Sequence, residues 1–198
     1  MSVVFGYIDR NKVSLAADNR MTDTDGNFVS DDDVKIAVVN DNAAVAFAGN
    51  CGAQSFFMDC YKEMRGYENW FVNELASNIV SMCDAIIKMD IEWARLIADS
   101  IAYFLVAGKT VGGEIKLFAI TLKKRKIDVK DVQIMLYQPI DCDFEECANI
   151  LCKNIKQYPN DFSKRTIHEI SKISRVVSDS GNMWSFDMQK EESKFDDF

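Results

Sequence analysis

The amino-acid sequence predicts a single α+β domain in which antiparallel β-sheets pack beneath separate helical layers. Strand patterns come in groups, and so do helix patterns, instead of alternating as they do in a parallel βαβ fold. The 198 residues are 48% hydrophobic with only 2 Pro and 9 Gly, so one sizeable core is expected and no linker is visible. Residues 1–198 are therefore treated as one domain.

Apolar alternation predicts four strands before any helix. Asp9, Arg10 and Asn11 favour a turn between the first two strands, which are therefore expected to pair as a hairpin. A polar excursion at residues 22–33 precedes the third strand. The four strands are expected at residues 2–8, 12–17, 34–39 and 43–48.

Apolar residues then recur every three or four positions, the spacing of amphipathic helices that bury one face. Two such helices are expected, followed by three strands, two more helices and a closing strand. The helices are expected at residues 52–65, 70–88, 143–157 and 164–177. The strands are expected at residues 101–107, 114–121, 132–136 and 183–188.

Charge and composition exclude several classes of function. The formal net charge is −8 and most basic residues are scattered, so the footprint of a nucleic-acid binder is missing. The most apolar stretch, at 97–108, is interrupted by Asp99 and is too short to span a bilayer. The six cysteines form no CxxC pair and are interpreted as reduced core residues. With no signal-peptide pattern visible, a cytoplasmic protein without membrane or nucleic-acid partners is expected.

Three consecutive aspartates at residues 31–33 raise the question of a metal site. Consecutive strand residues point to opposite faces, and an oxygen-ligand cage usually needs alternate positions on a loop. The cluster is therefore interpreted as a solvated turn.

The segment SVVFGYIDRNKVSLAADNRMT carries the most specific pattern in the chain. Ser2, Gly6, Asp18 and Arg20 keep the spacing found at the start of proteasome β-subunits and of the bacterial HslV peptidase, which the segment resembles. The likeness continues through VKI at 34–36 and AFAGNCGA at 46–53, and it covers at least the first 120 residues. It implies the fold of N-terminal nucleophile hydrolases, a four-layer αββα sandwich of two packed antiparallel sheets covered by helices.

The resemblance also implies a catalytic centre built on Ser2. In that family the first residue of the mature chain is the nucleophile and its own α-amino group is the general base, so Met1 has to be removed. Lys35 matches the lysine whose ammonium favours the alkoxide and the neutral amine. Asp18 matches the aspartate that pairs with this lysine and keeps it charged.

Two further positions match the family's centre. Gly49 matches the glycine whose backbone N–H supplies the oxyanion hole, although a glycine there also suits a strand-to-helix turn. Ser180 matches a late serine whose hydroxyl helps to order the terminal amine. The chain departs from the pattern where Tyr137 stands near the family's central Ser-Gly motif and where Val177 replaces a carboxylate. Asp179 is the neighbouring candidate to replace that carboxylate.

The sequence therefore predicts a self-compartmentalising peptidase that hydrolyses peptides or unfolded proteins without any cofactor. The partners implied by resemblance are copies of the chain in a ring and an ATP-dependent unfoldase. Two alternatives stay open: a catalytically inactive ring subunit and a hydrolase of small-molecule amides.

Substrate preference is expected to depend on Phe47, which the resemblance implies lies at the base of the pocket for the side chain before the scissile bond. A large apolar side chain there favours small or medium apolar substrate residues. Asp33, near the wall of the same pocket, would instead attract a basic side chain.

Overall fold

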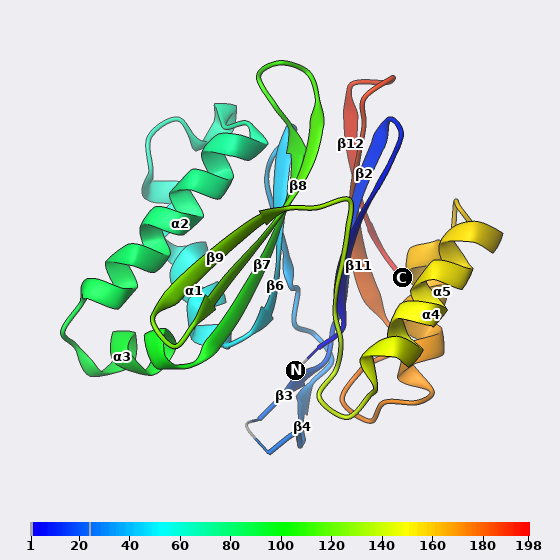
Figure 1. The fold of residues 1–198 in the computed structure, drawn as a ribbon, viewed down its shortest axis with the longest axis horizontal. Coiled ribbons are helices and arrows are strands. Elements are labelled where there is room, and N and C mark those ends of the chain that lie inside the picture. Colours follow the sequence, from blue (N-terminus) through cyan, green and yellow to red (C-terminus); the bar gives the residue numbers. More distant parts are fainter. Residues whose placement is uncertain (1, 24) are drawn as a thin grey trace.

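The computed structural model describes residues 2–23 and 25–198. In this part of the chain two large antiparallel sheets lie face to face, and a two-stranded sheet projects at one end (Figure 1). Helices α1, α2 and α3 lie outside one large sheet, whereas α4 and α5 lie outside the other. The helices are α1 (Cys51–Cys60), α2 (Val72–Lys88), α3 (Glu92–Asp99), α4 (Phe144–Gln157) and α5 (Phe162–Ser171).

The first large sheet contains the N-terminal hairpin and has the strand order β10-β1-β2-β11-β12. Its central strand β2 pairs with β1 on one side and with β11 on the other, so that Asp18 lies opposite Gly181. This register brings the two ends of the chain together around the end of β2. The strands are β1 (Val4–Asp9), β2 (Lys12–Asp18), β10 (Ile134–Tyr137), β11 (Gly181–Asp187) and β12 (Glu192–Asp197).

The second large sheet has the strand order β5-β6-β7-β8-β9, in which neighbours in sequence are also neighbours in space. Its strands are β5 (Ile36–Asn40), β6 (Ala43–Gly49), β7 (Ile101–Lys109), β8 (Ile115–Lys123) and β9 (Lys126–Asp131). The small sheet is a hairpin of β3 (Met21–Thr22) and β4 (Phe28–Ser30) between the two large sheets in sequence. Two 3₁₀ helices, Tyr61–Glu63 and Tyr67–Asn69, connect α1 to α2.

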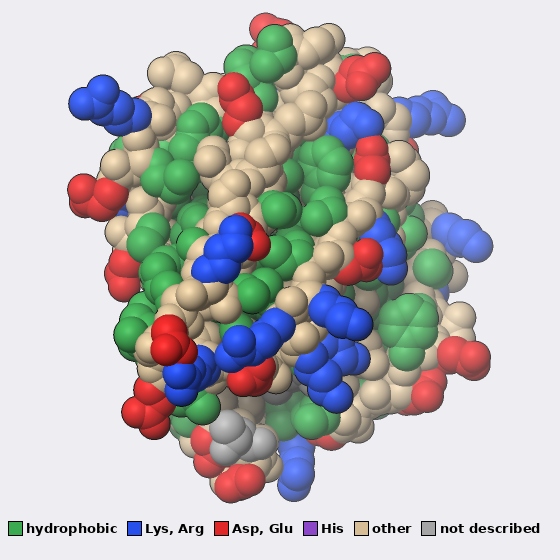
Figure 2. Space-filling model, turned by 60° about the vertical axis from the view of Figure 1, so that its left-hand side comes forward, with side chains coloured by type: hydrophobic (Ala, Val, Ile, Leu, Met, Phe, Trp, Pro, Cys, Tyr) green, Lys and Arg blue, Asp and Glu red, His purple; other side chains and the backbone are tan. Residues whose placement is uncertain are grey.

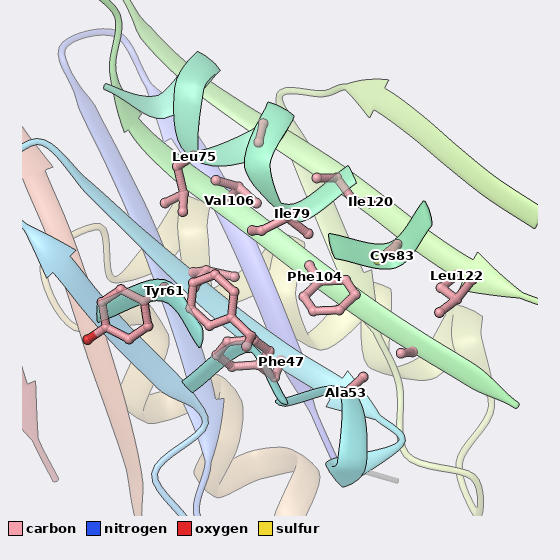
Figure 3. Close-up of a cluster of buried hydrophobic side chains, with 14 of the residues drawn as sticks. Phe47, Ala53, Tyr61, Leu75, Ile79, Cys83, Phe104, Val106, Ile120 and Leu122 are labelled. Atoms are coloured by element: carbon pink, nitrogen blue, oxygen red, sulfur yellow. The ribbon is translucent and has the colours of Figure 1, made fainter. Parts of the chain in front are cut away.

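Three buried hydrophobic clusters stabilise this arrangement. The cluster between the large sheets includes Leu15, Leu117 and the fully buried Trp184. A second cluster joins β6, β7 and β8 to α1 and α2 (Figure 3). A third joins β1 and β2 to α4 and α5. Alternating strand residues thus bury both faces of each large sheet.

The expected four-layer αββα sandwich of two sheets has to be corrected. The described chain is 36% strand and 33% helix, and it forms three antiparallel sheets with five α-helices, so the architecture is mostly β. The polar excursion at 22–33 contains the third sheet instead of only loop. The sequence pattern also missed β9 and β12, whose exposed residues are largely polar and therefore carry a weak apolar signal. It also missed α3, an amphipathic helix of only eight residues.

The expected helix at 164–177 is shorter, because α5 ends at Ser171. The following residues turn away from helical structure, and Val176 and Val177 are buried in the cluster beside α4 and α5. The chain then enters β11 at Gly181. This irregular connection carries Ser178 and Ser180 to the end of β2.

The aromatic residues of 56–71 mostly pack inside the domain. Phe57 and Trp70 belong to the buried cluster under α1 and α2. Phe56 packs on Trp93 with ring centroids 5.4 Å apart, and Trp93 is 42% exposed. On the face of the molecule seen in Figure 2, hydrophobic side chains are interspersed with charges of both signs.

Candidate active site

Asp18 is a fully buried carboxylate at the end of β2. Its Oδ1 accepts a hydrogen bond from the Val3 N–H at 3.0 Å, and its Oδ2 accepts from the N–H groups of Arg20 and Ser178 at 2.9 and 3.4 Å. Burial raises the pKa of Asp18, whereas the charge of Lys35 and these donors oppose that shift. The carboxylate therefore joins three separate segments of the chain at one point.

Lys35, directly before β5, is 4% exposed and reaches the same point. Its Nζ donates to the carbonyl oxygens of Asp18 and Arg20 at 2.6 and 2.7 Å, and it lies 3.3 Å from Oδ1 of Asp18. Burial lowers the pKa of the Lys35 ammonium, and Asp18 is the largest influence that raises it. Three acceptors match the three donors of an ammonium, so the geometry is that of the charged form.

Ser2 lies beside this ion pair and is 8% exposed. Its Oγ donates to the carbonyl oxygen of Arg20 at 3.4 Å, which is long for a hydroxyl donor and leaves the hydroxyl weakly held. The carbonyl of Arg20 thus receives both the Ser2 hydroxyl and the Lys35 ammonium. The expected removal of Met1 concerns a residue that lies outside the described residues.

The side chain of Arg20 has a different role from its backbone. Its Nε and Nη2 donate to the two oxygens of Asp31, each at 2.8 Å, and its Nη1 donates to the carbonyl oxygen of Arg175 at 3.0 Å. The guanidinium also lies over the ring of Phe28. Residues 31–33 lie in the irregular segment after β4, and Asp31 pairs there with Arg20 while its side chain stays 39% exposed.

Gly49 ends β6 with a φ of +90°, and a Cβ there would lie 2.4 Å from the carbonyl oxygen of Ile101. Glycine is thus required by the backbone itself. The N–H of Phe47 donates toward β5, to Lys35, whereas the N–H of Asn50 donates toward β7, to Ile101. Because N–H directions alternate along a strand, the N–H of Gly49 points to the β5 side, beyond the beginning of β5. It is directed to the side on which Lys35 lies.

Two adjoining cavities open at this point. The smaller, the Ser2 pocket, has a volume of about 70 Å³ and is lined by Ser2, Asp33, Lys35, Phe47 and Gly49, among other residues. The larger, the hairpin cavity, has a volume of about 530 Å³ and extends beside the β3–β4 hairpin. The structure therefore brings Ser2, Lys35 and Gly49 to one concave surface.

Ser180 approaches the network through its carbonyl oxygen, which accepts from the N–H of Asn19 at 3.2 Å, and through Ser178, a residue that the sequence pattern did not single out. Ser178 is 3% exposed; its Oγ accepts from the N–H of Asn19 at 3.1 Å and donates to the carbonyl oxygen of Ser180 at 2.8 Å. The Oγ of Ser178 also accepts a hydrogen bond from the Oγ of Ser180 at 3.4 Å. No hydrogen bond joins Ser180 to Ser2 among the described residues. The only local signal was a Ser-x-Ser spacing before a strand.

The two departures from the family pattern have structural counterparts. Val177 is 2% exposed in the apolar cluster beside α4 and α5, so no carboxylate stands there. Tyr137 pairs with Val4 and stacks on Tyr103 at 4.2 Å, and burial raises the pKa of Tyr137 to about 12. Asp179 is exposed and makes no hydrogen bond to Asp18 in the described part of the chain.

The cysteines and the acidic residues add no metal centre to this site. Across residues 2–23 and 25–198 no group of three or more His, Cys, Asp or Glu is placed to hold a metal ion. All six cysteines are free; Cys83 and Cys147 are buried, but Cys51 and Cys152 are exposed, so only some are core residues. None of the helices described is both long and apolar enough to cross a membrane.

Comparison with known protein families and with curated proteins gives no match.

Proposed function

We propose that this chain is an N-terminal nucleophile hydrolase of peptide bonds, in which Ser2 becomes the nucleophile after Met1 is removed. The observation that carries the proposal is the meeting of the Ser2 hydroxyl, the Lys35 ammonium and the Arg20 carbonyl at the Ser2 pocket. A buried, fully hydrogen-bonded lysine beside a weakly held hydroxyl is an arrangement suited to lowering the cost of forming an alkoxide.

In the proposed reaction the α-amino group of Ser2 takes the hydroxyl proton as Oγ attacks the carbonyl carbon of the substrate. A free α-amine has a pKa of about 7.7 to 8.0, so a useful fraction is neutral near pH 7. The N–H of Gly49 stabilises the oxyanion of the tetrahedral intermediate. The α-amino group of Ser2 then passes its proton to the substrate's leaving amine, which departs and leaves an ester on Ser2. Water hydrolyses this ester and regenerates Ser2. Asp18 holds Lys35 charged throughout.

The assembly is a separate part of the proposal and rests on the resemblance alone. It consists of a homo-oligomeric ring that encloses the sites, with an ATP-dependent unfoldase supplying unfolded protein. The proposed compartment is the cytoplasm, a reducing environment in which six free thiols persist. Light scattering tests the ring: a strictly monomeric particle across micromolar concentrations removes the compartment and leaves hydrolysis of small amides as the better proposal.

An inactive ring subunit is the second candidate. The observation that favours it is Val177, buried where the resembling family carries a carboxylate, while Asp179 does not join the Asp18 network in the described chain. Without that carboxylate, the amine of Ser2 has one partner fewer to orient it.

The two candidates are separated by the intact mass of the protein made in its own host and by turnover of fluorogenic peptides. Loss of the Met1 mass together with hydrolysis supports the enzyme. Retention of Met1 with no turnover of any member of a broad peptide set supports the inactive subunit.

A further inference from the structure

The hairpin cavity adjoins the Ser2 pocket, because both are lined by Thr22, Gly49, Asn50 and Cys51. Its other walls come from the β3–β4 hairpin, the beginning of β7, and the loops at 140–141 and 175–176. These segments lie together at the end of the molecule that carries β3 and β4 (Figure 1). An amide held between Ser2 and Gly49 would therefore have one side in the small pocket and the other in the hairpin cavity.

The deeper part of the hairpin cavity is apolar. Val176 is 1% exposed and Ile101 is partly buried, whereas Ile140, at 66% exposure, adds a hydrophobic side chain nearer the solvent. Gly26 of the hairpin lies against Val176, since a Cβ there would be 3.6 Å from the Val176 side chain. A long aliphatic chain can remove these surfaces from water.

The exposed rim of the cavity is mainly acidic. Among the residues that the structure describes, Asp23, Asp25 and Asp141 line it, and Arg175 is the one basic residue there. The hydrogen-bond donors to Asp23 are backbone N–H groups and the Asn27 amide, and the donors to Asp141 are the Ser174 hydroxyl, the Arg175 N–H and the Cys142 thiol. These donors are uncharged, so within residues 2–23 and 25–198 neither carboxylate has a positively charged hydrogen-bond donor. The chain as a whole is also acidic, with a formal net charge of −8.

We propose that the hairpin cavity binds a lysine-like side chain of the substrate segment that follows the scissile amide. The aliphatic stem lies over Val176 and Ile101 while the cation stays near the rim carboxylates, as long cationic side chains do on apolar surfaces. The inference rests on the proposed function, because Ser2 chemistry defines which amide is scissile. The hairpin cavity is thereby assigned to the substrate segment that leaves as the amine product, and it is expected to prefer a positively charged side chain in that segment.

The test uses equilibrium binding to the full-length Ser2→Ala protein, which cannot turn substrate over. Calorimetry compares three probes, acetyl-Ala-Ala-Xaa-Ala-Ala-amide with lysine, norleucine or glutamate at the variable position. Norleucine keeps most of the aliphatic stem without the charge. Lysine is expected to bind about two- to fivefold more tightly than norleucine, the range of an exposed ion pair, and glutamate most weakly. The lysine advantage should shrink as salt rises, since exposed charges are screened.

Four variants in the same background locate the effect. Asp25→Asn should reduce the ratio of lysine to norleucine affinity, and Arg175→Gln should increase it. Asp33→Asn, which changes the Ser2 pocket, and Glu63→Gln, which lies outside both cavities, should leave the ratio unchanged. The inference is overturned if the norleucine peptide binds as tightly as the lysine peptide or more tightly, or if no probe binds. It is also overturned if the ratio of lysine to norleucine affinity responds to Asp33→Asn but not to Asp25→Asn.

Failure of this inference can be told apart from failure of the proposed function. Hydrolysis of peptides by the wild-type protein with no lysine advantage in the binding series defeats the inference alone. Lysine-dependent binding that follows the Asp25 and Arg175 variants, without hydrolysis by the wild-type protein, supports the cationic site and defeats the proposed function alone.

Discussion

The Nζ atom of Lys35 lies 3.3 Å from Oδ1 of Asp18, and both side chains are almost completely buried. Burial opposes the charged form of each group, so it raises the pKa of Asp18 and lowers the pKa of Lys35. A pair of this kind is stabilised only because each charge has the other and several hydrogen bonds. Its two members are therefore strongly coupled.

We predict that Lys35→Met lowers the free energy of unfolding by about 3 to 5 kcal/mol, because it leaves the Asp18 carboxylate buried without its cation. The double variant Asp18→Asn, Lys35→Met should recover a large part of that loss, since no charge stays buried. Urea unfolding of the two single variants and the double variant measures this coupling. Strictly additive losses would show that the pair is not coupled.

Ser2→Ala is predicted to abolish amide hydrolysis while changing stability little. Only one hydroxyl is lost, and its hydrogen bond to the Arg20 carbonyl is long. Turnover of a fluorogenic peptide and the thermal midpoint are measured on the same preparation. Lys35→Ala should reduce turnover nearly as much as Ser2→Ala, because members of one catalytic unit are strongly non-additive. Turnover by Ser2→Ala equal to that of the wild type would end the proposal.

The Arg20–Asp31 pair predicts a pH dependence of stability in acid. Hydrogen bonds from the Arg20 side chain are the main cause that lowers the pKa of Asp31 below its usual value of 3.8. The folded-state pKa lies below that of the unfolded chain, so the stabilisation is complete above about pH 3.8 and is lost as pH falls through the folded value. Asp31→Asn should therefore have a lower free energy of unfolding than the wild type near neutral pH, and the two values should converge in acid.

The measurement is urea unfolding of the wild type and Asp31→Asn between about pH 7 and about pH 3. Asp59→Asn is the matched control, because Asp59 is exposed on α1 and makes no ion pair in the described residues. A stability difference between Asp31→Asn and the wild type that stays constant on acidification would contradict the assignment.

The local sequence pattern was sufficient to predict strands and helices with a clear apolar repeat. It was insufficient for features that depend on contacts between distant parts of the chain. The hairpin of β1 and β2 was predicted because its apolar runs flank a turn. Strand β12 was missed because ESKFDD has one large apolar residue and lies at the edge of its sheet, where it pairs with β11. The bidentate contact of Arg20 with Asp31 depends on how the β3–β4 hairpin folds back, which no periodicity records.

The candidate site, like the fold, was predictable only in part. Ser2, Asp18 and Lys35 were named from the resemblance, and the structure places them within one hydrogen-bond network. Ser178 was missed because its importance comes from the register of β11 against β2, which sets its N–H on Asp18. Serine in a connection has many uses, so its residue type alone carries little information.

The last prediction concerns the residue before the scissile bond, which enters the Ser2 pocket. This pocket has a volume of about 70 Å³, and Phe47 is among its lining residues. The ring of Phe47, which is 3% exposed, packs against Phe57 and Phe104. A charged group entering beside that ring loses hydration without gaining a partner, unless the partly exposed Asp33 on the same wall provides one.

Small or medium apolar residues are therefore expected to be cleaved faster than acidic or basic ones. A missing methylene should change discrimination by only about 1 to 3 kcal/mol, whereas an unpaired charge costs more. Fluorogenic peptides that differ only at this position give the profile for the wild type and Asp33→Asn. A preference for arginine or lysine that disappears in Asp33→Asn would assign specificity to Asp33 instead of Phe47, whereas an unchanged apolar preference in both proteins supports Phe47.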